Sequence, residues 1–267
     1  MPKRIGIDAG GSLIKVVYEE EGKFHYKAVP VNEMTSFASW IKTMAPEANF
    51  LVTGGKGRQF AELAEIDVTF VGEFDAATRG ARFLLTEQEK TVPDPFILVN
   101  IGTGTSIFYV SGDQFERVLG TGIGGGTLLG LGSLITGTRD YSRLIDLAKE
   151  GKRENCDLLV KDIYFPDIPP LGGDLTASNF GKVPFATESS KSDLMASLIQ
   201  MMGETLLTFA IQVAQMKQTG NIVFAGGTLN GNQPLMDVLT MFTNLLPYKP
   251  VFLEKGAFAG AMGAYLL

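Results

Sequence analysis

The chain begins with short, mostly apolar runs separated by glycine turns. Residues 4–8 and 13–18 read as two strands, because apolar side chains recur there at strand spacing. Gly10, Gly11 and Ser12 lie between them, and such a turn joins the strands of a hairpin. The next run, "FHYKAVPV" (24–31), continues the pattern as an edge strand. The first thirty residues therefore predict an antiparallel meander.

Helices and strands alternate over the rest of the first half. Phe37, Trp40, Ile41 and Met44 have helical spacing, and Pro46 ends that helix. The pattern then predicts a buried strand over 49–55, a short amphipathic helix over 58–66, a strand over 68–74 and a helix over 75–87. A Pro-Asp-Pro break at residues 93–95 follows, and we take it as the domain boundary.

The second half opens as the first does. "FILVNIGTGTSIFYV" (96–110) is again a strand, a turn rich in Gly and Thr, and a strand. This weak internal repeat predicts an α/β protein with two similar domains, 1–94 and 95–267, that face each other across a cleft. The later elements are helices over 124–137, 141–151, 190–218, 234–246 and 256–267, strands over 221–225 and 250–254, and an irregular excursion over 164–183.

Composition narrows the class of protein. The 267 residues are 45% hydrophobic and 19% charged, as in ordinary folded proteins. No apolar run approaches the roughly 20 residues of a membrane span, and no signal peptide is recognisable, so a cytoplasmic protein is expected. The net charge is −6 without a basic cluster, which disfavours nucleic acid as a partner. One Cys and one His exclude an internal disulfide and a Cys/His zinc site. Catalysis must use carboxylates, hydroxyls, backbone amides and cations.

The glycine turns carry the candidate chemistry. Glycines tolerate positive φ in a tight turn, and they let backbone N–H groups approach a phosphate. Taken alone, Gly10 and Gly11 are also an ordinary hairpin signal. Asp8 ends the first strand beside this turn, where an oxygen ligand suits hydrated Mg²⁺. Lys15 either reaches a phosphate or is solvated, and the sequence leaves both readings open.

Three such turns occur in a fixed order along the chain. The first is the Asp-Gly-Gly-Ser hairpin, the second is "GTGTS" (102–106), and the third is "AGGTLNG" (225–231), followed by a Gly/Ala-rich final helix. This order resembles the actin-like ATPase superfamily of sugar kinases, acetate kinase and the 70-kDa heat-shock chaperones. The resemblance implies that two hairpins clamp the phosphates of ATP while the third turn borders adenosine.

Phosphoryl transfer to an alcohol needs a carboxylate to accept the hydroxyl proton and cations to balance charge. Glu73 lies where a strand gives way to a helix, as a base in the cleft wall would. Asp75 competes for this role, but we expect it to cap a helix that begins at Ala76. Arg117 precedes a helix whose N-terminal glycines can bind phosphate. Its guanidinium suits a substrate carboxylate, although an isolated arginine is more often a surface residue.

Five segments together resemble a type II pantothenate kinase of staphylococci and related bacilli, a form similar to the eukaryotic enzymes. The segments are "GIDAGGSLIK" (6–15), "VGEFDA" (71–76), "LVNIGTGTSI" (98–107), "RVLGTGIGGGTLLGL" (117–131) and "GAFAGAMGA" (256–264). The resemblance implies Glu73 as general base, and Arg117 and Thr105 as pantothenate-binding residues. It implies nucleotide contacts at Asp8, Ala9, Gly10, Gly11, Ser12, Leu13, Ile14, Lys15, Thr103, Gly125, Gly126, Thr127, Leu128, Leu129, Tyr141 and Gly227.

The implied reaction converts ATP and pantothenate to ADP and 4'-phosphopantothenate, the first step towards coenzyme A. It would use Mg²⁺, held by Asp8 through water. The resemblance also implies a homodimer joined largely through the apolar segment 190–218. Two other functions stay open: a sugar or N-acetylhexosamine kinase of the same superfamily, and an actin-like or chaperone-like ATPase switch. The first is disfavoured because its repressor-and-kinase group usually carries a Cys/His zinc cluster.

Overall fold

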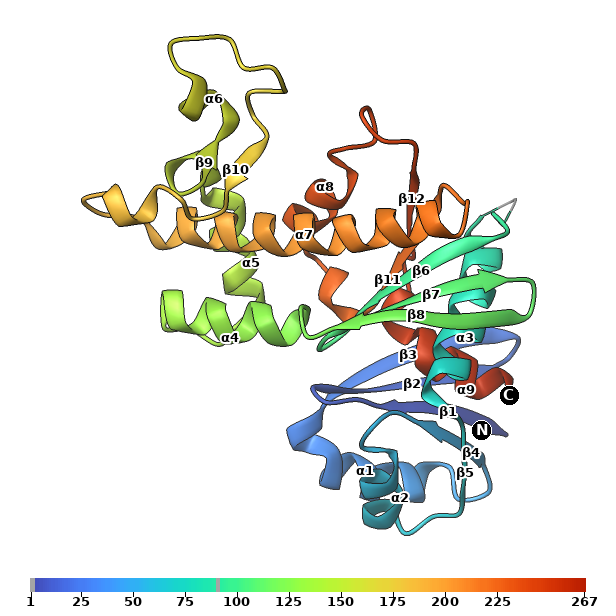
Figure 1. The fold of residues 1–267 in the computed structure, drawn as a ribbon. Coiled ribbons are helices and arrows are strands. Elements are labelled where there is room, and N and C mark those ends of the chain that lie inside the picture. The colour runs from blue at the N-terminus through green and yellow to red at the C-terminus, as the bar shows by residue number, and fades with distance from the viewer. Residues whose placement is uncertain (1–2, 90–91) are drawn as a thin grey trace.

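Two five-stranded sheets built on one plan form the centre of the protein (Figure 1). The computed structural model describes residues 3–89 and 92–267. The first sheet has the order β3-β2-β1-β4-β5 and the second the order β8-β7-β6-β11-β12. In each sheet the first three strands form an antiparallel meander, and the last two strands pair in parallel. This equivalence confirms the predicted α/β fold with a duplicated, hairpin-containing core.

Most strands agree with the sequence pattern, but the strand predicted over 68–74 ends at Phe70, and its last two residues belong to the following helix. Those of the first sheet are β1 (Arg4–Ala9), β2 (Leu13–Glu20), β3 (Lys23–Pro30), β4 (Asn49–Thr53) and β5 (Val68–Phe70). Those of the second are β6 (Phe96–Ile101), β7 (Thr105–Ser111), β8 (Gln114–Thr121), β11 (Asn221–Ala225) and β12 (Lys249–Phe252). The sequence analysis missed β8, whose alternation is obscured by exposed polar positions at this sheet edge.

The first sheet is covered differently on its two faces. Helices α1 (Met34–Met44) and α2 (Gly57–Ala64) cover one face, where they bury Ile7 and Val52. Helices α3 (Glu73–Gln88) and α9 (Ala259–Leu266) lie between the two sheets (Figure 1). They cross without intervening side chains: a Cβ on Gly263 would overlap the carbonyl group of Ala76.

The placement of α9 bears on the domain boundary. Gly6 of β1 lies directly against the backbone of α9, so the C-terminal helix packs on the first sheet. Helix α3, from the first half, packs with Phe96 and Leu98 of the second sheet. The division into 1–94 and 95–267 remains a proposal. Each half contributes one of the two helices, α3 and α9, that lie between the sheets.

The second sheet supports a helical layer. Its helices are α4 (Gly125–Thr136), α5 (Tyr141–Glu150), α7 (Lys191–Met216) and α8 (Gln233–Thr240), with α8 ending earlier than predicted. Contrary to the sequence expectation, α7 is long and apolar enough to span a membrane by length and composition alone. However, 61% of its apolar window is buried inside the protein, where it contributes Leu198, Met202 and Leu206 to the core. Helix α7 is thus the core helix of this half.

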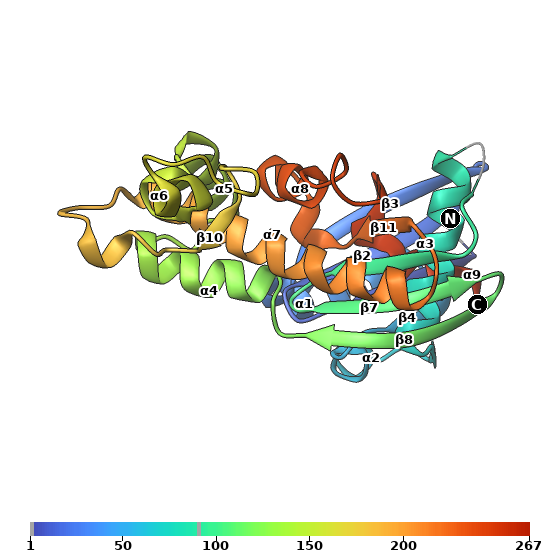
Figure 2. The same ribbon diagram turned by 45° about the horizontal axis from the view of Figure 1, so that its top comes forward.

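Short elements precede and interrupt the irregular excursion predicted over 164–183. β9 (Leu158–Leu159) and α6 (Val160–Tyr164) lead into it, and β10 (Thr176–Ser178) lies within it. All three stand out at one end of the molecule beside the start of α7 (Figures 1 and 2). Arg153 donates to the Thr176 hydroxyl at 2.9 Å, and Glu204 of α7 accepts from the same hydroxyl. These bonds fix the base of the excursion. The described residues also form 3₁₀ turns at Val31–Glu33, Arg153–Asn155, Val183–Phe185, Gly227–Leu229 and Gly256–Phe258.

Candidate active site

Asp8 lies near the end of β1, paired in register with Lys15 of β2. The Lys15 ammonium contacts Asp8 Oδ2 at 3.0 Å, and the two side chains are 17% and 16% exposed. Gly54 and Gly260 leave room for the carboxylate, since a Cβ on Gly260 would lie 2.9 Å from Asp8 Oδ2. Gly260 is in the first turn of α9, where the partial positive charge of a helix N-terminus favours an anion. The fold therefore holds a charged pair beside the first hairpin turn.

The two hairpin turns face each other across the site. A Cβ on Gly11 would lie 3.4 Å from the Thr103 hydroxyl oxygen of the second turn. The Gly10 amide donates to the Leu13 carbonyl at 3.1 Å. Within the described residues, the amides of Gly11 and Ser12 have no protein acceptor. The expected positive φ at Gly10 and Gly11 is wrong, because neither has a left-handed backbone. Their role is close approach, with amides left available.

The start of α4 corrects one prediction about phosphate. The Gly125 amide donates to the Gly102 carbonyl at 2.8 Å, and the Gly126 amide donates to the Thr103 carbonyl at 2.9 Å. These two amides are therefore already bonded, and they do not offer the open helix N-terminus that the sequence predicted. The absence of a side chain at Gly124 lets the start of α4 approach the second turn this closely, because a Cβ there would lie 2.8 Å from Thr103 O. The glycine run ties α4 to the second turn.

The third glycine turn joins the same cluster. Gly226 has a φ of 109°, and a Cβ there would collide with the Ile101 carbonyl. Thr228, which the sequence analysis did not single out, donates to the Gly102 carbonyl at 2.8 Å. The Tyr141 hydroxyl donates to the Thr228 carbonyl at 2.5 Å, and burial raises the pKa of this phenol. Thr228, the residue after Gly227, therefore links Tyr141 to the second hairpin turn by hydrogen bonds.

Glu73 begins helix α3, two residues before the predicted start. Asp75 is not the cap: the N-cap residue is Gly72, and Asp75 lies within the first turn. Burial raises the pKa of the Glu73 carboxyl, and the negative charge of Asp8 adds to this effect, whereas Lys15 opposes it. The charges of both Asp8 and Lys15 therefore act on the Glu73 carboxyl. A carboxylate with a raised pKa beside a charged pair has the character of a general base.

Arg117 reaches the same region from β8 of the other sheet. Its guanidinium carbon lies 5.1 Å from the centre of the Phe74 ring, one residue after Glu73. The Phe74 ring is 41% exposed and also contacts Phe108 edge-on at 5.5 Å. Arg117 Nε lies 3.5 Å from the Ser106 hydroxyl oxygen. A cation therefore lies against an exposed aromatic ring at the start of α3, the helix that begins with Glu73.

Several predicted contact residues are buried by their side chains. Ala9, Ile14 and Leu128 belong to the hydrophobic core, so only their backbone groups can face a ligand. Thr105 is also buried, and its hydroxyl donates to the Ile123 carbonyl at 2.7 Å. While this bond is kept, the Thr105 hydroxyl could meet a substrate only as an acceptor. The remaining residues of the predicted set, Leu13, Thr127 and Leu129, are partly exposed.

The donor set at Asp8 suits Mg²⁺. In the described part of the chain, no three His, Cys, Asp or Glu side chains come together as a metal site. Magnesium commonly binds through one or two carboxylates, retained waters and substrate phosphates. Asp8 supplies a carboxylate at a site flanked by small residues. Beside it, the buried Thr53 hydroxyl has no hydrogen-bond partner within the described residues. The residues present therefore fit a hydrated Mg²⁺ ion.

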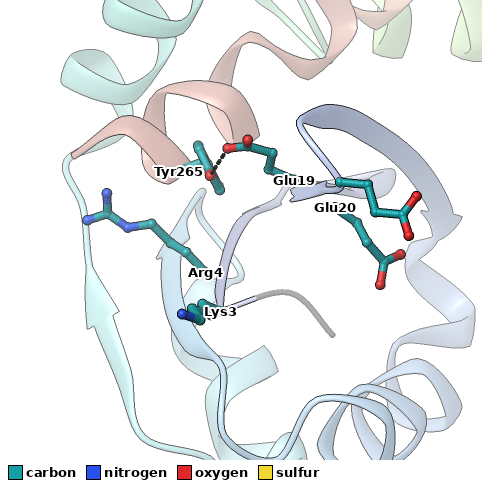
Figure 3. Close-up of a pocket in the computed structure, with 6 residues that line it drawn as sticks. Lys3, Arg4, Glu19, Glu20 and Tyr265 are labelled. Atoms are coloured by element: carbon teal, nitrogen blue, oxygen red, sulfur yellow. Dashed lines mark hydrogen bonds between the residues drawn. The ribbon is translucent and has the colours of Figure 1, made fainter.

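A separate depression of about 430 Å³ lies at the opposite end of β1 and β2 from the first turn (Figure 3). Arg4 and Tyr265 line it, and the Tyr265 hydroxyl donates to Glu19 at 2.9 Å. It shares no residue with the cluster at the turns.

Comparison with known proteins identifies the family. A protein-family model described as Fumble matches residues 19–267. A type II pantothenate kinase from Oceanobacillus iheyensis is 48% identical over 264 residues, which cover 99% of both chains. This chain belongs to the type II pantothenate kinase family. Every segment quoted for the resemblance therefore lies within the aligned length of a type II pantothenate kinase.

Two solved structures share the fold of this type II pantothenate kinase family member. One is an activator of 2-hydroxyisocaproyl-CoA dehydratase from Clostridium difficile with bound ADPNP, with a TM-score of 0.66 at 15% identity, covering 98% of this chain and 92% of that chain. The other is a ROK family glucokinase from Streptomyces griseus in complex with glucose and AMPPNP, with a TM-score of 0.56 at 13% identity, covering 98% and 97%. The chain therefore shares its fold with both of these nucleotide-bound proteins.

Proposed function

We propose that this protein transfers the γ-phosphoryl group of ATP to the primary hydroxyl of pantothenate, giving 4'-phosphopantothenate and ADP. The relative that is 48% identical carries the name of this activity. The observation that carries the proposal is the contact of Arg117, from β8 of the second sheet, with the ring of Phe74, the residue that follows Glu73 at the start of α3. A base, a cation and an apolar surface in one region suit an acceptor with a hydroxyl, a carboxylate and an aliphatic segment.

In the proposed reaction, Glu73 accepts the proton of the acceptor hydroxyl. A bond forms between that oxygen and the γ-phosphorus, and the bond from this phosphorus to the β–γ bridging oxygen breaks with its electrons going to ADP. Arg117 orients the acceptor through its carboxylate. Lys15 and the amides of Gly11 and Ser12 balance phosphate charge. Bound Mg²⁺, which Asp8 would hold through water, supplies electrostatic stabilisation of the phosphates.

The nucleotide would lie between the hairpin turns. We propose that its phosphates contact the 8–15 turn and Thr103, and that its adenosine contacts Tyr141 and Gly227. Support comes from the opposition of Gly11 to Thr103 and from the bond between Tyr141 and Thr228. For Gly125 and Gly126 we propose a supporting role, because their amides already bind the second turn.

The cellular setting is also a proposal. We infer a cytoplasmic enzyme and a homodimer, as expected for the family. The apolar side chains of α7, which suggested a dimer, are mostly buried in the core of a single chain. A dimer would more readily cover the exposed apolar side chains of α4 and the excursion, which are Leu131, Leu134, Ile163, Phe165, Ile168, Leu171 and Phe185. Light scattering at micromolar concentration tests this, and a monomeric mass contradicts it.

The function is tested by ADP release from Mg·ATP with pantothenate, glucose, N-acetylglucosamine or no acceptor at equal concentrations. Release that requires pantothenate supports the proposal. Release with a sugar alone would favour the sugar kinase, and equal release in every sample would favour the ATPase switch. The glucokinase likeness concerns the fold alone and does not favour the sugar reading.

A further inference from the structure

Thr53 is a buried residue that the mechanism above does not use. It ends strand β4 and is only 3% exposed, yet its hydroxyl oxygen finds no hydrogen-bond partner in the described chain. A buried hydroxyl without a partner destabilises the folded state, and native proteins contain few of them. Valine has nearly the same shape without this cost. The hydroxyl at this position therefore needs an explanation other than folding.

The position of Thr53 relative to Asp8 supplies one. Strands β1 and β4 are parallel, and Asp8 and Thr53 are partners in their register. Residues paired in this way project from the same face of a sheet. Leu51, two residues earlier on β4, contacts Ala76 and Ala264, so this face is turned towards α3 and α9. Lys15, Asp8 and Thr53 thus form a polar row across β2, β1 and β4.

The turn after Thr53 keeps the Asp8 carboxylate close to this strand. Gly54 has a φ of 91°, and a Cβ there would lie 2.7 Å from Asp8 Oδ1. The Lys56 amide donates to the Ala9 carbonyl at 3.0 Å, which fixes the turn against the first hairpin. Asp8 therefore lies between two possible donors. The Lys15 ammonium contacts Asp8 Oδ2, and Thr53 lies on the opposite side of Asp8 from Lys15.

We propose that Thr53 is a positioning residue that orients Asp8 for Mg²⁺. When bound nucleotide phosphates draw the Lys15 ammonium away from Asp8, the carboxylate loses its partner. The Thr53 hydroxyl then donates to Asp8 and holds it in the orientation that receives a water ligand of Mg²⁺. This inference rests on the nucleotide-binding part of the proposed function and is independent of the acceptor.

Thr53→Val separates this role from a purely structural one. Because the hydroxyl has no partner, its removal should raise the melting temperature of the protein without nucleotide. The same change should weaken Mg·ADP binding by roughly tenfold, the effect of losing a hydrogen bond to a charged group. Thr53→Ser keeps the hydroxyl and should bind Mg·ADP as the wild type does. Metal-free ADP, measured in EDTA, should bind wild type and Thr53→Val alike.

Scanning and titration calorimetry provide both readouts. Thr78 gives a matched control, because it is equally buried but its hydroxyl donates to the Phe74 carbonyl at 2.8 Å. Thr78→Val should lower the melting temperature and leave Mg·ADP affinity unchanged. A lower melting temperature for Thr53→Val, unchanged Mg·ADP affinity, or a wild type that does not bind Mg·ADP would each overturn the proposal. A protein that passes these tests but does not phosphorylate pantothenate contradicts only the proposed function.

Discussion

Glu73 stands at the start of α3 with a carboxyl pKa that burial and Asp8 raise. Replacing it with Gln removes the proton acceptor and keeps the size of the side chain. We expect kcat to fall by about 10² or more, as for loss of a general base, while Mg·ATP binding is retained. Steady-state kinetics and nucleotide titration measure the two effects. Asp75→Asn is the control, and wild-type turnover in Glu73→Gln would move the role to Asp75 or to the substrate.

Arg117 lies over the Phe74 ring and forms no ion pair with the part of the chain that the structure describes. Its removal should therefore weaken acceptor binding without disturbing a charged partner in the fold. We expect Arg117→Ala to raise the KM for pantothenate by at least about tenfold, since charge-assisted pairing with a carboxylate is lost. The KM for Mg·ATP should stay within about twofold of wild type. If initial-rate measurements give an unchanged KM for pantothenate, Arg117 does not belong to the acceptor site.

At the scale of elements, the crossing of α3 and α9 sets the separation of the two sheets. Gly263→Ala would place a methyl group on the Ala76 backbone. We expect a loss of at least about 2 kcal/mol of stability, because neither helix can yield without moving a sheet. Gly130→Ala in α4 is the control: no atom lies within 4 Å of the added Cβ, so it should stabilise by about 0.5–1 kcal/mol. Denaturant unfolding compares them, and equal effects would contradict the close crossing.

The attachment of the excursion predicts a pH dependence. Asp157 is fully buried, accepts from the Phe180 amide at 2.8 Å, and has its pKa raised chiefly by burial. The folded protein therefore binds this proton more tightly than the unfolded chain does. The stability that it contributes is present below the ordinary carboxyl pKa and is lost as pH rises through the folded value. Asp157→Asn keeps an acceptor without titrating.

Thermal unfolding of wild type and Asp157→Asn between pH 4 and 8 tests this sign. The melting temperature of the variant, relative to wild type, should increase with pH and then level off. A difference that is constant with pH would show that the ion pair with Arg153 at 3.5 Å balances burial, and one that decreases would show that it outweighs burial. Either result would contradict the expected sign.

The sequence predicted elements well where burial of one face makes apolar residues recur at regular spacing. The apolar runs of β1, β4, β6 and β11 are buried and were recognised, whereas β8 lies at an edge and was missed. The start of α3 was misplaced by two residues because no capping side chain marks it. Local sequence signals thus identify buried elements better than exposed edges and helix starts.

At the scale of the whole molecule, the site is assembled from both sheets. The glycine turns could be recognised from sequence, but their bonding could not, because the tie between α4 and Gly102 depends on tertiary contact. The same holds for Thr53, whose importance is visible only from its register with Asp8 and its unpartnered hydroxyl. Arg117 is distant from Glu73 in sequence, and its contact with Phe74 brings it to the start of α3.

The central claim is that a pantothenate hydroxyl receives the phosphoryl group with Glu73 as base. The most direct measurement is mass spectrometry of the products formed from Mg·ATP and pantothenate by wild type and Glu73→Gln. We predict that wild type adds one phosphoryl group to pantothenate, in amounts equal to the ADP formed, and that the variant does so at least about 10² more slowly. ADP formation with unmodified pantothenate would contradict the claim.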